Sequence, residues 1–62
     1  MKFKIKERKP KLNQIIVIKS KLELIPIVGI WELNNGKEEV YIPIRGDIEL
    51  PNNIEWWAEI PE

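Results

Sequence analysis

Turn-forming residues divide this chain into short segments. The apolar residues between them include twelve isoleucines and three tryptophans, but one alanine and no threonine. Such β-branched and aromatic residues favour strands over helices. We therefore expect residues 1–62 to form a single all-β domain, a small antiparallel sheet of about five short strands that is strongly bent or open-barrel-like. The expected turns are Arg8 to Asn13, Lys19-Ser20-Lys21, Asn34-Asn35-Gly36, Arg45-Gly46-Asp47 and Pro51-Asn52-Asn53.

The predicted strands follow from the apolar pattern of each segment. Residues 2–7 alternate, which places Phe3 and Ile5 on one face of a half-buried strand. Residues 14–19 form a continuous apolar run, as expected of a central strand covered on both sides. Residues 22–33 contain Pro26 and Gly29, which predict a bend or bulge. The remaining predicted strands are residues 38–44, returning after the Asn-Gly turn, and residues 54–60.

The length and the missing residue types exclude several kinds of stabilisation and chemistry. At 62 residues the chain is near the lower size limit for a domain that folds alone. It contains no cysteine and no histidine, so we expect no disulfide, no metal site and no cofactor. No segment approaches the roughly 20 apolar residues of a membrane span, and the start has no apolar signal core. These features predict a cytoplasmic protein that does not enter a membrane.

The supply of catalytic groups is small. Ser20 is the one nucleophilic hydroxyl of a serine or threonine, and no histidine is present to activate it. Glu55 and Glu59 would lie about 13 Å apart along an extended strand. That separation exceeds the roughly 5 to 9.5 Å that paired glycosidase carboxylates use. We therefore expect a protein that is not an enzyme and has no catalytic residues.

Basic residues concentrate at the beginning of the chain. Residues 1–21 contain eight basic residues and one acidic residue, a net charge of +7, whereas residues 22–62 contain two and nine, a net charge of −7. In a continuous strand, basic residues at even positions would line one face about 6.7 Å apart, near the phosphate spacing of a single nucleic-acid strand. The residues concerned are Lys2, Lys4, Lys6 and Arg8.

This basic stripe has two interpretations. It could follow the backbone of a nucleic acid, as in a small β-barrel nucleic-acid-binding protein. Alternatively, it is a solvated outer face whose cations pair across strands with Glu49, Glu55 or Glu59.

Trp56 and Trp57 are consecutive, so a regular strand points them to opposite faces. Strict alternation groups Trp56 with Ile54 inside and leaves Trp57 outside with Glu55 and Glu59. A bulge would exchange the two tryptophans. The outward ring is either an anchor for a protein partner, as tryptophan often is at interfaces, or a cover for the far face of the sheet.

Both ends of the chain resemble a small phage and prophage family called domain of unknown function 551. The opening Phe3 to Pro10 and Asn13 to Ile18 are similar to that family's extended start, acidic-Arg-Leu-Pro turn and aliphatic strand. The closing Ile54 to Glu62 is similar to its Trp and Leu-Pro-Glu ending, an alignment that places Trp57 on the family's usual tryptophan. The chain differs at Lys2, Lys9 and Glu59, where the family usually has Trp, Leu and Pro. The resemblance implies a phage-associated domain and carries over no catalytic residue.

These observations predict a non-enzymatic, phage-encoded or mobile-element-encoded protein that binds a bacterial host protein. Inhibition of a defence system such as CRISPR is the most concrete version. Its candidate contact residues are Trp56, Trp57, Glu55 and Glu59. The alternatives are nucleic-acid binding through the basic stripe, and a structural role as a homo-oligomer or minor component of an assembly, through pairing of exposed strand edges.

Overall fold

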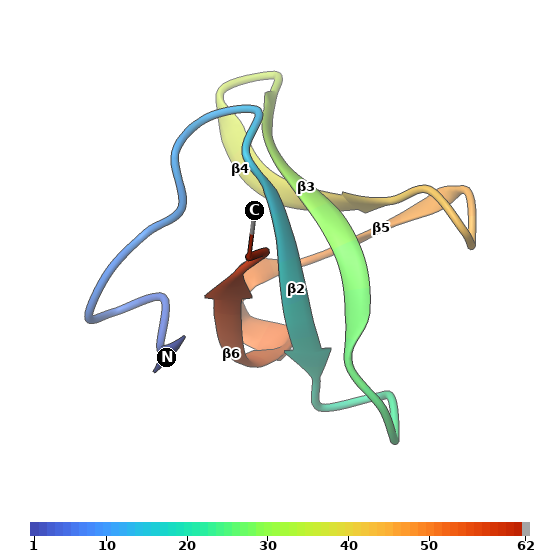
Figure 1. Cartoon of the computed structure of the whole chain (residues 1–62). Coiled ribbons are helices and arrows are strands. Elements are labelled where there is room, and N and C mark those ends of the chain that lie inside the picture. Colours follow the sequence, from blue (N-terminus) through green and yellow to red (C-terminus); the bar gives the residue numbers. More distant parts are fainter. Residues whose placement is uncertain (62) are drawn as a thin grey trace.

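The computed structural model describes residues 1–61 and is all-β, which confirms the predicted fold class. In these residues six antiparallel strands form one open sheet with the order β1-β6-β2-β3-β4-β5. Figure 1 shows β3 curving along its length and β5 running at a steep angle to β2. The elements are β1 (Lys2–Phe3), β2 (Ile15–Ser20), β3 (Ile27–Asn34), β4 (Lys37–Ile42), β5 (Asp47–Glu49), a 3-10 turn η1 (Pro51–Asn53) and β6 (Ile54–Glu59).

The hairpin between β3 and β4 forms where the Asn-Gly signal predicts it. Asn34 pairs with Lys37, so Asn35 and Gly36 form a two-residue connection. Their φ angles are 52° and 77°, the left-handed conformations that this tight turn requires. A second glycine, Gly46 with φ of 72°, lies in the turn before β5.

The predicted first strand is wrong beyond Phe3. After β1 the chain turns, because the Lys4 carbonyl accepts hydrogen bonds from the backbone N–H groups of Glu7 and Arg8. The Glu7 carboxylate in turn accepts a hydrogen bond from the Lys4 backbone N–H at 3.1 Å. Phe3 and Ile5 nevertheless pack against the core, as their alternation predicts.

The centre and the end of the sheet also differ from the prediction. The short strand β5 was not expected, because its three residues follow a turn and show no long alternation. Of the predicted bend or bulge in residues 22–33, the bend is found at Leu24 and Ile25, directly before Pro26. A bulge at Gly29 is absent from the described pairing: Val28, Gly29 and Ile30 pair in sequence with β2. The register shift of the sheet lies instead between Lys19 and Ser20, where β2 pairs with β6.

One face of the sheet, here called the inner face, carries the hydrophobic core. Trp57 pairs with both Phe3 and Ile18, and its indole N–H donates to the Arg8 carbonyl at 2.8 Å. The N-terminal segment is thereby attached to the inner face. The buried core residues are Ile16, Ile18, Trp31, Val40, Ile42, Ile54 and Trp57.

Gly29 permits β3 and β4 to approach closely at this core. A Cβ atom at position 29 would overlap the Val40 side chain and lie 3.1 Å from Ile42 Cδ1. The glycine therefore serves close packing, and its φ angle is not in the left-handed region.

Candidate functional site

Of the two consecutive tryptophans, Trp56 is the exposed one. Trp57 has no exposed area, whereas Trp56 is partly exposed. The grouping of Trp56 with Ile54 inside is therefore wrong, because the register shift between β2 and β6 lets Ile54 and Trp57 both reach the core. Trp57 cannot contact a partner without opening the fold, and Trp56 alone of the pair remains a candidate contact residue.

The opposite side of the sheet, here called the outer face, is also apolar. Register places Ile15, Ile30, Tyr41 and Ile48 opposite one another across four strands. Residues paired directly across an antiparallel sheet lie on the same face. Val17 and Val28 form the neighbouring pair on this face. The outer face thus consists of Ile15, Val17, Val28, Ile30, Tyr41 and Ile48.

Much of the outer face is exposed to solvent. The exposed fractions are 55% for Ile15, 46% for Val28 and 43% for Ile48. The prediction that the strand 14–19 is covered on both sides is therefore wrong: β2 is central in the sheet, but Ile15 is uncovered. The continuous apolar run Ile15 to Ile18 also fits one buried and one exposed apolar face, because successive residues of a strand point to opposite faces.

The outer face continues into an apolar hollow at one end of the sheet. The hollow has a volume of about 620 Å³ and lies between the loop before β3 and the turn after β4. Ile25 and Ile44 line it and are 71% and 83% exposed. Val28 belongs to both the hollow and the outer face, so the two form one continuous apolar surface.

Arg45 joins the two loops that border this hollow. Its guanidinium contacts Glu23 at 2.6 Å and Asp47 at 2.8 Å. Hydrogen bonds to these two carboxylates raise the pKa of Arg45 above its ordinary value. The same group lies 3.5 Å from Glu49 Oε1, which is buried and has no hydrogen-bond partner within residues 1–61. Arg45 thus fixes the rim of the hollow and supplies the countercharge of a buried carboxylate.

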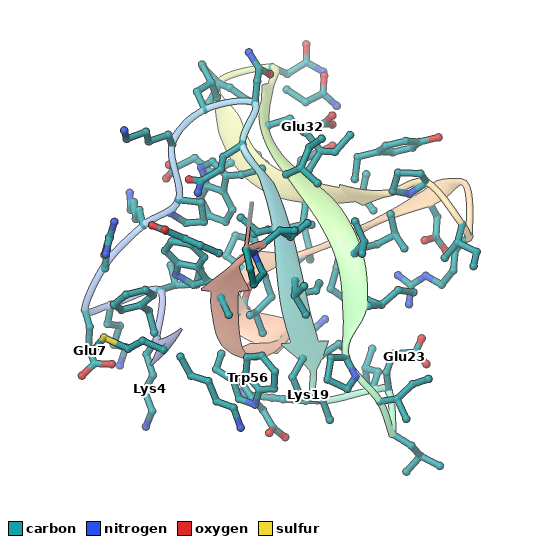
Figure 2. The ribbon with its side chains drawn as sticks, in the orientation of Figure 1. Lys4, Glu7, Lys19, Glu23, Glu32 and Trp56 are labelled. Carbon is teal, nitrogen blue, oxygen red and sulfur yellow. The ribbon has the colours of Figure 1, made fainter. Side chains whose placement is uncertain are left out.

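Two glutamates border the outer face at its other end. Glu32 pairs directly with Glu39, two residues along the strands from the Ile30 and Tyr41 pair and on the same face. The pKa of Glu32 is raised by a side-chain hydrogen bond with Glu39, by burial and by repulsion from the Glu39 charge. Figure 2 shows Glu32 at the end of the molecule opposite Trp56.

A basic groove lies at the end of the molecule away from Glu32, between residues 2–7 and 51–56. Its volume is about 870 Å³, and its walls include Phe3, Ile54 and Trp56. Figure 2 shows Lys4 and Trp56 toward the same lower edge of the molecule. Because β1 ends at Phe3, the regular stripe at even positions does not form, but most of its members gather here with one additional lysine. The lysines of the groove are Lys2, Lys4, Lys6 and Lys21.

Arg8 is the member of the predicted stripe that the groove does not include. Its guanidinium binds Glu59 at 2.8 Å and lies 4.6 Å from the centre of the Phe3 ring. The expected cross-strand pairing is thus found for Arg8 and Glu59. Glu55 lies 4.0 Å from Lys19, and Glu49 contacts Arg45, so neither of these glutamates pairs with the stripe.

The groups considered for catalysis are separated or already bonded. Ser20 is buried, and its hydroxyl accepts a hydrogen bond from the Leu22 backbone N–H at 3.0 Å. Asp47 binds Arg45, and Tyr41 lies on the outer face. Within residues 1–61 no group of three or more acidic, histidine or cysteine side chains is placed to hold a metal ion.

Comparisons of the chain with profiles of known protein families, with curated protein sequences and with solved structures find no match. Among residues 1–61 no helix is long and apolar enough to cross a membrane.

Proposed function

We propose that this chain is a non-enzymatic binding protein whose outer face docks against another protein. The observation that carries the proposal is the continuous apolar surface formed by the outer face and the adjoining hollow. Contiguous exposed apolar patches of this kind mark interaction sites in small proteins. Burial of apolar area is the main favourable term in most protein associations.

The borders of this surface define the chemistry of the partner. The Glu32 and Glu39 pair lies at one end of the outer face, and Lys19 lies near the other, opposite Trp56 across β2 and β6. A complementary partner presents an apolar ridge with a basic side chain toward the two glutamates. Such a cation would also relieve the repulsion between them.

A bacterial host protein, specifically a component of a defence system such as CRISPR, is the partner class we propose. Three features support this choice: the small size, the scarce catalytic groups and the sequence resemblance to a phage-associated family. A domain without a reaction of its own can act by occupying a surface. On this proposal the chain is encoded by a phage or mobile element and works in the cytoplasm of the host.

The proposal assigns different parts to the four contact residues expected from the sequence. Trp56 lies beside the outer face and belongs to the rim of the interface. Glu55 lines the basic groove, and Glu59 is paired with Arg8. We therefore expect charge reversal of Glu55 or Glu59 to weaken partner binding less than substitution on the outer face.

The test is affinity capture from a bacterial host lysate with and without nuclease, using two matched variants. Ile15→Lys places a charge on the outer face, whereas Leu33→Lys places the same charge on the inner side of β3 at an equally exposed position, 54% against 55%. After nuclease treatment we expect one host protein to be recovered with the parent chain and with Leu33→Lys. We expect it not to be recovered with Ile15→Lys. Equal recovery with both variants would contradict it.

Self-association is the alternative use of the same surface. Both edges of the sheet are short, two residues in β1 and three in β5, and short edges disfavour pairing between copies through strands. Sedimentation at several concentrations distinguishes the cases. A dimer that Ile15→Lys dissociates would assign the outer face to a second copy of this chain.

A further inference from the structure

The eight basic residues of the N-terminal third differ in whether they form ion pairs. Arg8, Lys9 and Lys19 form ion pairs with Glu59, Glu38 and Glu55 respectively. Lys11 lies exposed in the loop before β2. The other four surround the basic groove, and within residues 1–61 none of them forms an ion pair: Lys2, Lys4, Lys6 and Lys21.

The acidic residues of the groove offset only part of this charge. Glu7 and Glu55 both line it. The Glu7 carboxylate already accepts the Lys4 backbone N–H, and Glu55 lies at ion-pair distance from Lys19 outside the groove lining. Four lysines against two engaged glutamates leave the groove with a positive field that favours an anionic ligand.

The groove also has a flat apolar wall. Phe3 and Ile54 belong to the core behind it, and Trp56 is the partly exposed indole at its side. The Lys2 ammonium lies 4.5 Å from the centre of the Trp56 ring. An exposed cation–π contact of this kind is weak, so a stacking ligand can displace the ammonium, which then remains close enough to meet the ligand's charge.

From these contacts we propose that the groove binds single-stranded nucleic acid, with a base stacked on Trp56 and phosphates bound by Lys2, Lys4, Lys6 and Lys21. Aromatic stacking beside a basic track is the common solution for sequence-tolerant binding of single strands. A duplex keeps its bases stacked inside and offers the indole no free ring. Its four lysines are not among the residues of the outer face, whereas Trp56 borders both surfaces. Lys4→Gln therefore tests this proposal separately, and Ile15→Lys tests the docking proposal separately.

The experiment titrates the protein into a fluorescein-labelled oligothymidylate of about 12 nucleotides and follows anisotropy at several salt concentrations. With four phosphate contacts, the logarithm of the affinity is expected to fall with the logarithm of salt at a slope of about −3. Lys4→Gln is expected to reduce the magnitude of that slope by about 1. Lys37→Gln, an exposed lysine of the β3–β4 hairpin outside the groove, is the matched control and is expected to leave the slope unchanged.

Stacking is tested at Trp56. Trp31 and Trp57 are buried, so quenching of tryptophan fluorescence by the oligonucleotide is expected to come from Trp56. Trp56→Leu is expected to bind about tenfold more weakly and to lose the quenching, whereas Trp56→Tyr keeps much of the affinity. Urea unfolding of both variants establishes that they are folded.

Three results would overturn the proposal. They are equal affinity for a duplex of the same length, equal affinity for inorganic polyphosphate with no effect of Trp56→Leu, and loss of oligonucleotide binding in Ile15→Glu but not in the equally exposed Leu33→Glu. The first two would reduce the groove to a site of general charge attraction. The third would place the ligand on the outer face.

Discussion

The two faces of the sheet are built from similar apolar residues but differ in exposure to solvent. On β2, Ile16 and Ile18 have no exposed area, whereas Ile15 between the turn and the core is 55% exposed. Phe3 and Ile5 from the N-terminal segment pack against the core of the inner face, which includes Ile54 at the start of β6. A run of apolar residues therefore does not by itself identify which face of a single-layer sheet forms the core. Residues 1–61 bury one apolar face and leave the other partly exposed.

Substitutions on the two faces are therefore expected to affect stability and binding differently. Each large apolar side chain buried on the inner face contributes roughly 1.5 to 3 kcal/mol to folding. A half-exposed side chain on the outer face contributes less to folding and keeps apolar area that a partner can bury.

The largest loss of stability is expected at the tryptophan pair, where one ring is buried and the other is partly exposed. Trp57→Ala removes a fully buried indole and its hydrogen bond to the Arg8 carbonyl, so we expect a loss of about 3 to 5 kcal/mol in the free energy of unfolding. Trp56→Ala is expected to cost less than about 1 kcal/mol, since its ring is partly exposed. Urea unfolding measures both, and equal losses would contradict the assignment of the two rings.

A smaller loss of stability is expected on the inner face at Gly29. Gly29→Ala introduces a Cβ that overlaps Val40, and overpacking of this kind costs about 1 to 3 kcal/mol. In the Val40→Ala background the same change is expected to cost less, because the overlapping methyl group is gone. A double-mutant cycle in urea checks this coupling. Additive losses would show that the close approach of β3 and β4 is not the cause.

The smallest effect lies at the acidic border of the outer face. A raised pKa means that folded Glu32 holds its proton more strongly than the unfolded chain, so this group adds stability at low pH. That contribution is lost as pH rises from the ordinary value of 4.5 through the raised pKa. Glu32→Gln is expected to raise the melting temperature at pH 7, with the difference from the parent shrinking at lower pH. A difference that does not depend on pH would contradict the proton shared with Glu39.

The parts of the fold that local sequence controls were predictable. The Asn35-Gly36 turn requires positive φ angles, which these residues adopt readily, and it fixes the β3–β4 hairpin. The end of β1 was not predictable from alternation, because a turn held by the Glu7 carboxylate and the Lys4 backbone stops the strand.

The candidate site was only partly predictable, since it depends on pairing between distant segments. Which tryptophan is buried follows from the register shift at Lys19 and Ser20, and one sequence does not reveal that shift. The lysines at positions 2, 4 and 6 were recognised as a group, but their meeting with Lys21 and Trp56 requires the turn after β1. The apolar outer face was present in the sequence as Ile15, Val17 and Val28, and its exposure became evident only from the sheet order.

Site-specific photo-crosslinking is the sharpest test of whether the outer face docks on a protein. A benzophenone amino acid replaces Ile15 on the outer face in one variant and Leu33 on the inner side in the other, at nearly equal exposure. We expect that, in a bacterial host lysate, position 15 crosslinks to one host protein and position 33 does not. Crosslinking of that protein through position 33 but not position 15, or crosslinking of position 15 only to another copy of this chain, would contradict it.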